Sequence, residues 1–175
     1  MINKAKKLIG KECKIRLISE QNRYGKIIEA SKIWLLVENI EDFRIDGYCF
    51  YVWEVIANIW YRQQEKFTEK IKKRKAQYQD DTIDKIWIED FSSFFYSIRH
   101  TLMMIETKRW KNIFCKIVNI NEKDILVKNF DSYGKREKKE ERVQYKNIFC
   151  VEFSNDYLMT FKKYMEKEAN MPLQK

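Results

Sequence analysis

Apolar and polar side chains alternate over short stretches along most of the chain, which predicts β-strands. Residues 14–18 (KIRLI) alternate charged and apolar positions, as a strand with one buried face does. The segments 25–30 (GKIIEA) and 34–39 (WLLVEN) follow, separated by SKI. Two such runs joined by a short polar link predict a β-hairpin.

Two further strands are predicted in the first half of the chain. Residues 48–53 (YCFYVW) form one of them, entered through Asp46-Gly47, a dipeptide favoured in tight turns. The last strand is short and covers 57–61 (ANIWY), after a single tight turn. The first half therefore contains about five short strands.

Three segments follow a helical period instead. Residues 62–78 contain few helix breakers and place Phe67 and Ile71 four residues apart on one side. Residues 89–102 carry a single apolar face with the period of an α-helix. Ser154 is predicted to cap a last helix.

The pattern of the first half recurs in the second half. Residues 24–41 match 114–131 at an offset of 90 without a gap, and 53–61 match 145–153 at an offset of 92. Identical pairs in the first match are Lys26/Lys116, Ile27/Ile117, Leu36/Leu126, Val37/Val127 and Asn39/Asn129. About one identity is expected by chance over such a window. We therefore predict a tandem duplication.

The pentapeptide KNIFC occurs at 111–115 and at 146–150, but it is not the repeat unit. Under the offsets above, the first occurrence leads into the second strand of its copy. The second occurrence leads into the last strand of the same copy. The identity of the two pentapeptides is therefore a coincidence, although the longer repeat is real.

The predicted fold is mainly β with helices (α+β): two tandem five-stranded antiparallel small barrels, joined and capped by α-helices. Residues 1–79 form the first barrel with a trailing helix. Residues 80–175 form the second, with a leading helix at about 88–101 and a C-terminal helix. The boundary is placed near 78–84 (YQDDTID), the most loop-like stretch. Each copy is expected to enclose its own apolar core, although a barrel of roughly 60 residues is marginal alone.

This order of features resembles the Sm-like and SH3-like small barrels. Gly25-Lys26-Ile27 opens the second strand, LLV follows in the third, and Gly47 precedes the fourth. The resemblance implies a five-stranded, strongly bent antiparallel barrel in each copy.

Many Sm-like proteins bind uridine-rich RNA through an Asp after strand two and an Asn just before strand three. Ser31 and Asn121 stand where that Asp would be, and Trp34 and Asp124 replace the expected end of the loop. In the second copy, Cys115 occupies the position of the glycine that opens strand two. The resemblance therefore does not carry the nucleotide pocket over to this chain.

Composition excludes several classes of function. With four glycines and one proline, the chain has no glycine-rich phosphate loop. No apolar run approaches the roughly 20 residues that span a bilayer. No secretory signal is apparent in the charged N-terminus, so a cytoplasmic location without membrane association is predicted.

The cysteines do not predict a metal site or a cofactor. Cys13, Cys49, Cys115 and Cys150 lie far apart, with no CxxC motif and no nearby histidine. Zinc ligands usually come in close sequence pairs. We expect reduced thiols that pack as small apolar side chains.

The formal net charge is +9, and two basic clusters are candidates for contact with nucleic acid. The residues are Lys72, Lys73, Arg74, Lys75, Tyr133, Lys135, Arg136, Lys138 and Lys139. In the second cluster Tyr133 could stack on a base. Two other interpretations of the basic residues remain open. The positive charge could reflect only the general richness of the chain in Lys, Ile and Asn, and the second cluster could be a solvated hairpin in which glutamates interrupt the basic run.

No catalytic constellation is present. His100 is the only histidine, and no nucleophile motif accompanies it, so a surface position is expected. We predict a non-catalytic binding module for a protein partner, through a strand edge or an aromatic face. The alternative is RNA or single-stranded nucleic acid, whose binding would weaken steeply with salt. A strand edge could also pair two copies into a dimer.

Overall fold

The computed structural model describes residues 1–70, 86–109, 111–131 and 136–170. The side chains of 136–139 and 168–170 are not described. The boundary predicted near 78–84 lies outside these residues.

The chain is mainly β with helices, as predicted. The first half contains α1 (Ile2–Lys6), β1 (Glu12–Leu17), β2 (Asn22–Ala30), β3 (Trp34–Glu41), β4 (Arg44–Val52), β5 (Ile56–Trp60) and α2 (Gln63–Thr68). The second half contains α3 (Phe91–Ser97), β6 (Met103–Thr107), β7 (Asn112–Ile120), β8 (Asp124–Phe130), β9 (Arg136–Gln144), β10 (Ile148–Phe153) and α4 (Asp156–Asn170). A 3-10 turn precedes the last strand of each half, at Trp53–Val55 and Tyr145–Asn147.

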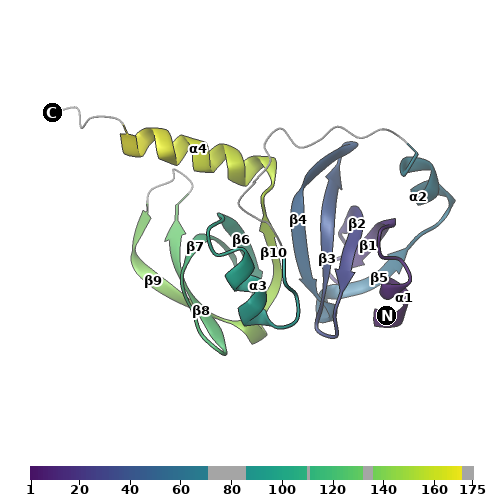
Figure 1. Ribbon diagram of the computed structural model, residues 1–175, viewed down its shortest axis with the longest axis horizontal. Coiled ribbons are helices and arrows are strands. Elements are labelled where there is room, and N and C mark those ends of the chain that lie inside the picture. The colour runs from purple at the N-terminus through teal and green to yellow at the C-terminus, as the bar shows by residue number, and fades with distance from the viewer. Residues whose placement is uncertain (71–85, 110, 132–135, 171–175) are drawn as a thin grey trace.

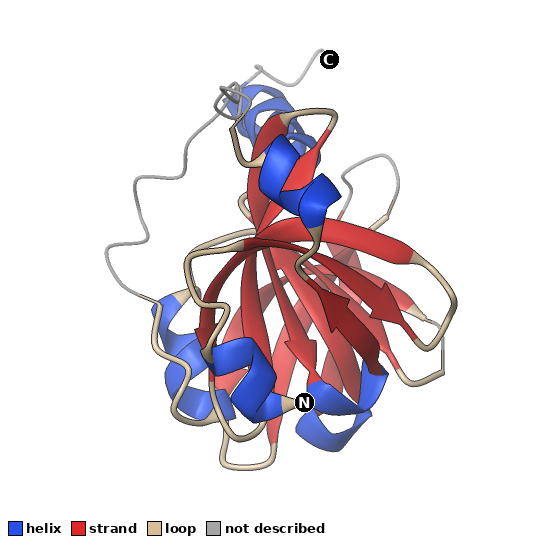
Figure 2. Ribbon diagram, turned by 90° about the vertical axis from the view of Figure 1, so that its right-hand side faces the viewer, coloured by secondary structure: helices blue, strands red, loops and turns tan. Residues whose placement is uncertain are grey.

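All ten described strands belong to one antiparallel sheet, in the order β5-β1-β2-β3-β4-β10-β6-β7-β8-β9. Figure 1 shows β4 and β10 side by side at the middle of the molecule, and Figure 2 shows how strongly the strands twist. The two halves are therefore not separate sheets, and the described pairings close neither half into a ring. Pairing between β4 and β10 joins them.

The strand register repeats between the two halves, at the offset that the sequence repeat predicts. In the first half Gly25 lies opposite Asn39, and in the second Cys115 lies opposite Asn129, which is the same pair displaced by 90. Each hairpin also has its register shift at the same place, after Ile27 in one and at the corresponding position in the other. The two copies of KNIFC lead into β7 and β10, which are different positions of the repeat.

One hydrophobic cluster spans both halves, so the expectation of two separate cores was wrong. The aromatic rings at the junction show why. Phe94 of α3 stacks on Phe50 of β4 at 4.1 Å and meets Phe153 of β10 edge-on at 5.9 Å. Trp34 of β3 is fully buried, and its Nε1 donates to the Ile88 carbonyl at 2.7 Å. Because α3 of the second half covers β3 and β4 of the first, both faces are buried along residues 34–37 of β3 and 49–52 of β4.

The predicted turn at Asp46-Gly47 was also wrong. The chain turns at Asp42 and Phe43, whose φ angles are 45° and 60°, whereas Gly47 lies inside β4 with φ 67°. A Cβ on Gly47 would lie 2.5 Å from the Asn155 amide nitrogen. The glycine therefore serves the close approach of β4 to the end of β10, which no local pattern reveals.

Asn155, not Ser154, caps the last helix. The Leu158 amide donates to Asn155 Oδ1 at 2.8 Å, while Ser154 takes a left-handed conformation with φ 55°. Asp46 Oδ1 accepts from the Asp156 amide at 2.7 Å. Side chains from both halves thus satisfy the free amides at the start of α4.

The helix predicted at 89–102 is shorter than its apolar face indicates. Asp90 caps α3 by accepting from the Ser93 amide at 2.8 Å. After Ser97 the Thr101 amide and hydroxyl both donate to the Ile98 carbonyl, at 3.0 and 2.8 Å, and a tight turn leads into β6. The predicted helix at 62–78 is described only as α2, because residues beyond 70 lie outside the described part.

Replacing Gly47 by alanine should destabilise the protein far more than replacing Gly10. Both residues have left-handed φ angles, so each alanine costs about 1–2 kcal/mol of backbone strain. A Cβ on Gly10 meets nothing within 4 Å, whereas on Gly47 it meets backbone. We expect a total loss of about 3 kcal/mol or more for Gly47→Ala. Urea unfolding measures both, and equal losses would contradict the close approach.

The Asp90 cap should make stability depend on acid pH. Hydrogen bonds from the Ser93 amide and hydroxyl lower the pKa of Asp90 from its ordinary value of 3.8. Since the folded-state pKa is the lower one, the stabilisation is complete above about pH 5 and is lost as pH falls through the folded-state pKa. Asp90→Ala should cost about 1 kcal/mol at pH 7. Asp90→Asn keeps the acceptor and should show a flatter pH profile in thermal melts; a wild-type profile in this variant would refute the assignment.

Candidate binding site

The two basic clusters singled out in the sequence lie largely outside the described part of the structure. Lys72, Lys73, Arg74, Lys75, Tyr133 and Lys135 are outside the described residues. Arg136, Lys138 and Lys139 belong to β9, the strand at one outer edge of the sheet, and only their backbone is described. Contact of these residues with nucleic acid therefore stays a prediction.

The rest of the charged run on β9 is occupied by ion pairs within the protein. Glu141 binds Lys111 Nζ at 2.6 Å and accepts from Asn129 Nδ2 at 2.7 Å. Burial raises the pKa of Glu141, but these two hydrogen bonds outweigh it and lower the pKa. Arg142 pairs with Asp124 at 3.1 Å. This part of β9 is a charged, internally paired edge strand.

Aromatic rings and cations alternate on the outer face of the opposite edge. Trp60 of β5, Lys14 of β1 and Tyr24 of β2 lie opposite one another in register. Lys14 Nζ lies 5.8 Å from the Tyr24 ring centre and 5.9 Å from that of Trp60. At these distances the cation is attracted to both rings.

The chain that leaves β5 extends this surface. Arg62 lies 5.5 Å from the Trp60 ring, and Lys11 and Lys66 lie 5.8 and 5.7 Å from the Tyr61 ring. These residues are not among the predicted site residues. Alternation along β1 does place Lys14 on its outer face, but its aromatic neighbours come from strands that only the fold brings together.

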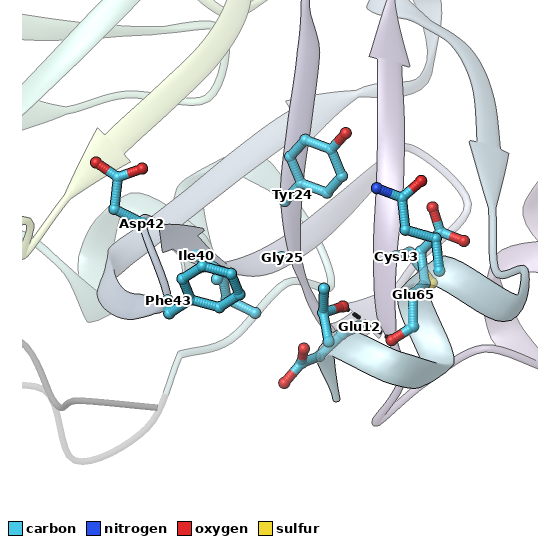
Figure 3. Close-up of a pocket in the computed structure, with 10 residues that line it drawn as sticks. Glu12, Cys13, Tyr24, Gly25, Ile40, Asp42, Phe43 and Glu65 are labelled. Atoms are coloured by element: carbon cyan, nitrogen blue, oxygen red, sulfur yellow. Dashed lines mark hydrogen bonds between the residues drawn. The ribbon is translucent and has the colours of Figure 1, made fainter. Parts of the chain in front are cut away.

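A cavity of about 220 Å³ opens beside Tyr24, between the β3–β4 turn and α2 (Figure 3). Two aromatic rings, Tyr24 and Phe43, share its lining with three carboxylates, Glu12, Asp42 and Glu65. The remaining lining residues are Cys13, Gly25, Ile40, Gln64 and Thr68. We call these ten residues the acidic pocket.

Backbone geometry shapes the acidic pocket. A Cβ on Gly25 would lie 2.2 Å from Val37 and 2.6 Å from the Glu38 carbonyl, so only glycine fits there. The positive φ angles of Asp42 and Phe43 place the Phe43 ring at the rim, where it is 52% exposed. Strained backbone of this kind gathers at functional sites.

The chemistry of the acidic pocket favours a cationic ligand. Carboxylates attract a positive charge, and the faces of the two rings add to that attraction. A phosphate would meet like charges. Glu65 is 5% exposed, and its carboxylate accepts from the Arg62 amide at 2.7 Å, which holds it in place.

The thiol of Cys13, which lines the pocket, is not an activated nucleophile. Burial, followed by the charges of Glu65 and Glu69, raises the pKa of the Cys13 thiol to about 12. A thiol with this pKa is protonated and unreactive at neutral pH. His100 is exposed in the turn after α3, as expected for a surface residue.

Comparisons with protein-family models, curated proteins and solved structures give no match. No helix in the described part of the chain is long and apolar enough to cross a bilayer.

Replacing Phe43 by glycine should stabilise the protein while it removes one wall of the acidic pocket. Glycine accepts φ 60° without strain, and relief of such strain is worth about 1 kcal/mol. Ile33→Gly is the matched control, since Ile33 is also an exposed apolar residue next to a strand but has no positive φ. Urea unfolding should show a gain for Phe43→Gly and a loss for Ile33→Gly. A loss for both would show that the Phe43 conformation is not strained.

Proposed function

We propose that this chain is a non-catalytic binding module that recognises a protein partner by accepting one of its Lys or Arg side chains. The observation that carries the proposal is the acidic pocket, in which aromatic rings and carboxylates share one cavity. The aromatic face beside it, formed by Tyr24, Lys14 and Trp60, would contact the neighbouring part of the partner.

Charge favours a protein over a nucleic acid at this cavity. The whole protein carries a net charge of +9, yet three residues with carboxylate side chains, Glu12, Asp42 and Glu65, line the pocket. A concave site whose charge is opposite to that of the surrounding surface selects for a ligand group of complementary charge, because the electric field is concentrated inside the concavity. The partner segment would be basic at one position and apolar or uncharged on either side, since the surrounding surface is basic.

The strand edges are less suited to recognition than this face. At the outer edge of β5, the Ile59 amide donates to Asn58 Oδ1 at 2.8 Å, and Lys4 Nζ donates to the same oxygen at 3.3 Å. The other edge, β9, carries charges that are paired within the protein. Natural proteins use such devices to discourage pairing with another strand. They also argue against a dimer built by strand pairing.

We also infer that the two halves descend from a small barrel of the Sm-like or SH3-like kind. Strand order within each half, with the last strand beside the first, supports this descent. The positions that correspond to the nucleotide-binding residues of Sm-like proteins make hydrogen bonds within their own loops here. The Ser31 hydroxyl accepts from the backbone amide of Trp34 at 3.2 Å, and the side-chain Nδ2 of Asn121 donates to Asp124 Oδ1 at 2.7 Å.

Single-stranded nucleic acid is the second candidate ligand. The row of Trp60, Lys14 and Tyr24, flanked by Arg62 and Lys66, favours it, because bases stack on aromatic rings while cations contact phosphates. This ligand would occupy the aromatic face and avoid the acidic pocket. The two candidates share Tyr24, but Phe43 belongs only to the acidic pocket and Trp60 only to the aromatic face.

Binding of a basic peptide should depend on Phe43, and binding of RNA should depend on Trp60. We would titrate the full-length protein with short unstructured peptides that carry one central Arg, and with single-stranded RNA, by fluorescence anisotropy. For the peptide, Phe43→Ala should weaken binding about tenfold, and replacing its Arg by norleucine should abolish binding. Loss of one such ring contact in a pocket corresponds to about 1–2 kcal/mol.

Tyr96→Ala is the control, because Tyr96 is an exposed tyrosine on α3, away from the pocket. RNA binding would instead fall roughly tenfold between 50 and 200 mM salt, as expected for about three phosphate contacts. If peptides with norleucine in place of Arg bind as tightly as the Arg peptides, the proposed recognition of a basic side chain is wrong. RNA binding that is lost in Trp60→Ala and kept in Phe43→Ala would establish the second candidate in its place.

A further inference from the structure

Thiols and carboxylates from the two halves meet at the junction between β4 and β10. The sulfur atoms of Cys49 and Cys150 and a carboxylate oxygen of Glu152 all lie within 4.8 Å of one another. Cys49 lies opposite Glu152 in register, and Cys150 is the next residue on the same face of β10. This is the one group of potential metal ligands found in the described part of the chain.

Other polar groups surround the cluster. Glu106 Oε2 accepts from Cys150 Sγ at 3.4 Å, which adds a second carboxylate. Tyr51 lies opposite Cys150 in register and is 1% exposed, and its hydroxyl has no hydrogen-bond partner. A small cavity of about 10 Å³ lies beside the cluster and is lined in part by Tyr51, Glu106 and Cys150.

The carboxylate of Glu152 is already oriented. Arg23 approaches its Oε1 at 3.9 Å, and Asn155 Nδ2 donates to its Oε2 at 3.4 Å. Metal ligands in proteins are usually fixed by such outer contacts, which set the direction of the ligand atom. The arrangement at the junction therefore has both inner ligands and outer support.

Comparison of the two halves shows that the cysteines belong to the junction. By the register of the repeat, Cys49 corresponds to Glu141 on β9, and Cys150 corresponds to Asn58 on β5. The strands at the outer edges thus have no cysteine where the joined strands have one each. At these two positions of the repeat, a thiol is present only on the strands where the two halves touch.

We propose that Cys49, Cys150 and Glu152 bind a zinc ion, with Glu106 as the fourth ligand. Two thiolates and two carboxylate oxygens satisfy the tetrahedral preference of Zn²⁺. Binding replaces the two thiol protons by the metal, so two protons are released for each ion bound. The Tyr51 hydroxyl, which now lacks a partner, gains a thiolate acceptor. The ion would fasten the first half to the second.

Zinc titration of the full-length protein, in the presence of a phosphine reductant, tests the site. Calorimetry should give one Zn²⁺ per chain, and the melting temperature should rise with added Zn²⁺, because the ion binds the folded state. Co²⁺ in place of Zn²⁺ should produce the intense near-ultraviolet absorption of a cobalt–thiolate bond. A spectrum without that absorption would overturn ligation by cysteine.

Single variants assign the ligands. Cys49→Ser and Cys150→Ser should each weaken Zn²⁺ binding at least about tenfold and reduce the thiolate absorption of the Co²⁺ complex by about half, because one of the two thiolates remains, and Glu152→Gln should weaken binding with that absorption retained. Cys115→Ser is the matched control, since Cys115 is a buried cysteine that belongs neither to the cluster nor to the acidic pocket, and it should bind as the wild type does. Melts without metal verify that each variant folds. Wild-type affinity in both Cys49→Ser and Cys150→Ser, or no binding to the wild type, would overturn the proposal.

Discussion

The pairing of β4 with β10 is the contact on which the rest of this structure depends. Without it, each half would be a short open sheet of five strands with little apolar area to bury. Pairing puts two backbone edges together and brings α3 of the second half onto Phe50 of the first. Because that face of β4 is then covered by the other half, one continuous core replaces two marginal ones. Gly47 is the residue that lets the backbones come this close.

With β4 and β10 paired, the two outer edges of the sheet and the acidic pocket remain exposed, and they differ in their chemistry. The outer edges are β5, where Asn58 holds the free amide of Ile59, and β9, where charges pair within the protein. Neither edge offers a simple continuation of the sheet. No described residue of β5 or β9 lines the acidic pocket, which lies between the β3–β4 turn and α2 and combines charge and aromatic rings in one cavity. For this reason we place recognition at the pocket and the proposed zinc ion at the junction, where it would reinforce the contact between the halves.

The sequence prediction failed at positions where the role of a residue is set by contact with another residue that is distant in the chain. Asp46-Gly47 has the composition of a turn, but Gly47 is required by the approach of Asn155, and Asp46 caps α4. The candidate basic residues were chosen as runs along the chain, whereas Lys14 acquires its aromatic neighbours across three strands. Cysteine spacing likewise gave no sign that Cys49 and Cys150 lie close together, because they meet only through the pairing of β4 with β10.

The sequence by itself determined the strands, most of their order along the chain and the duplication, because alternation and repeat are local or periodic properties of the residues. The shared register of the two hairpins follows from the same repeated residues. Only the tertiary structure decided that the halves share one core, that Phe43 borders a cavity with Glu65, and that two cysteines face each other. The physical reason is that packing and strand pairing act between surfaces, and no period in a single chain specifies which two surfaces will meet.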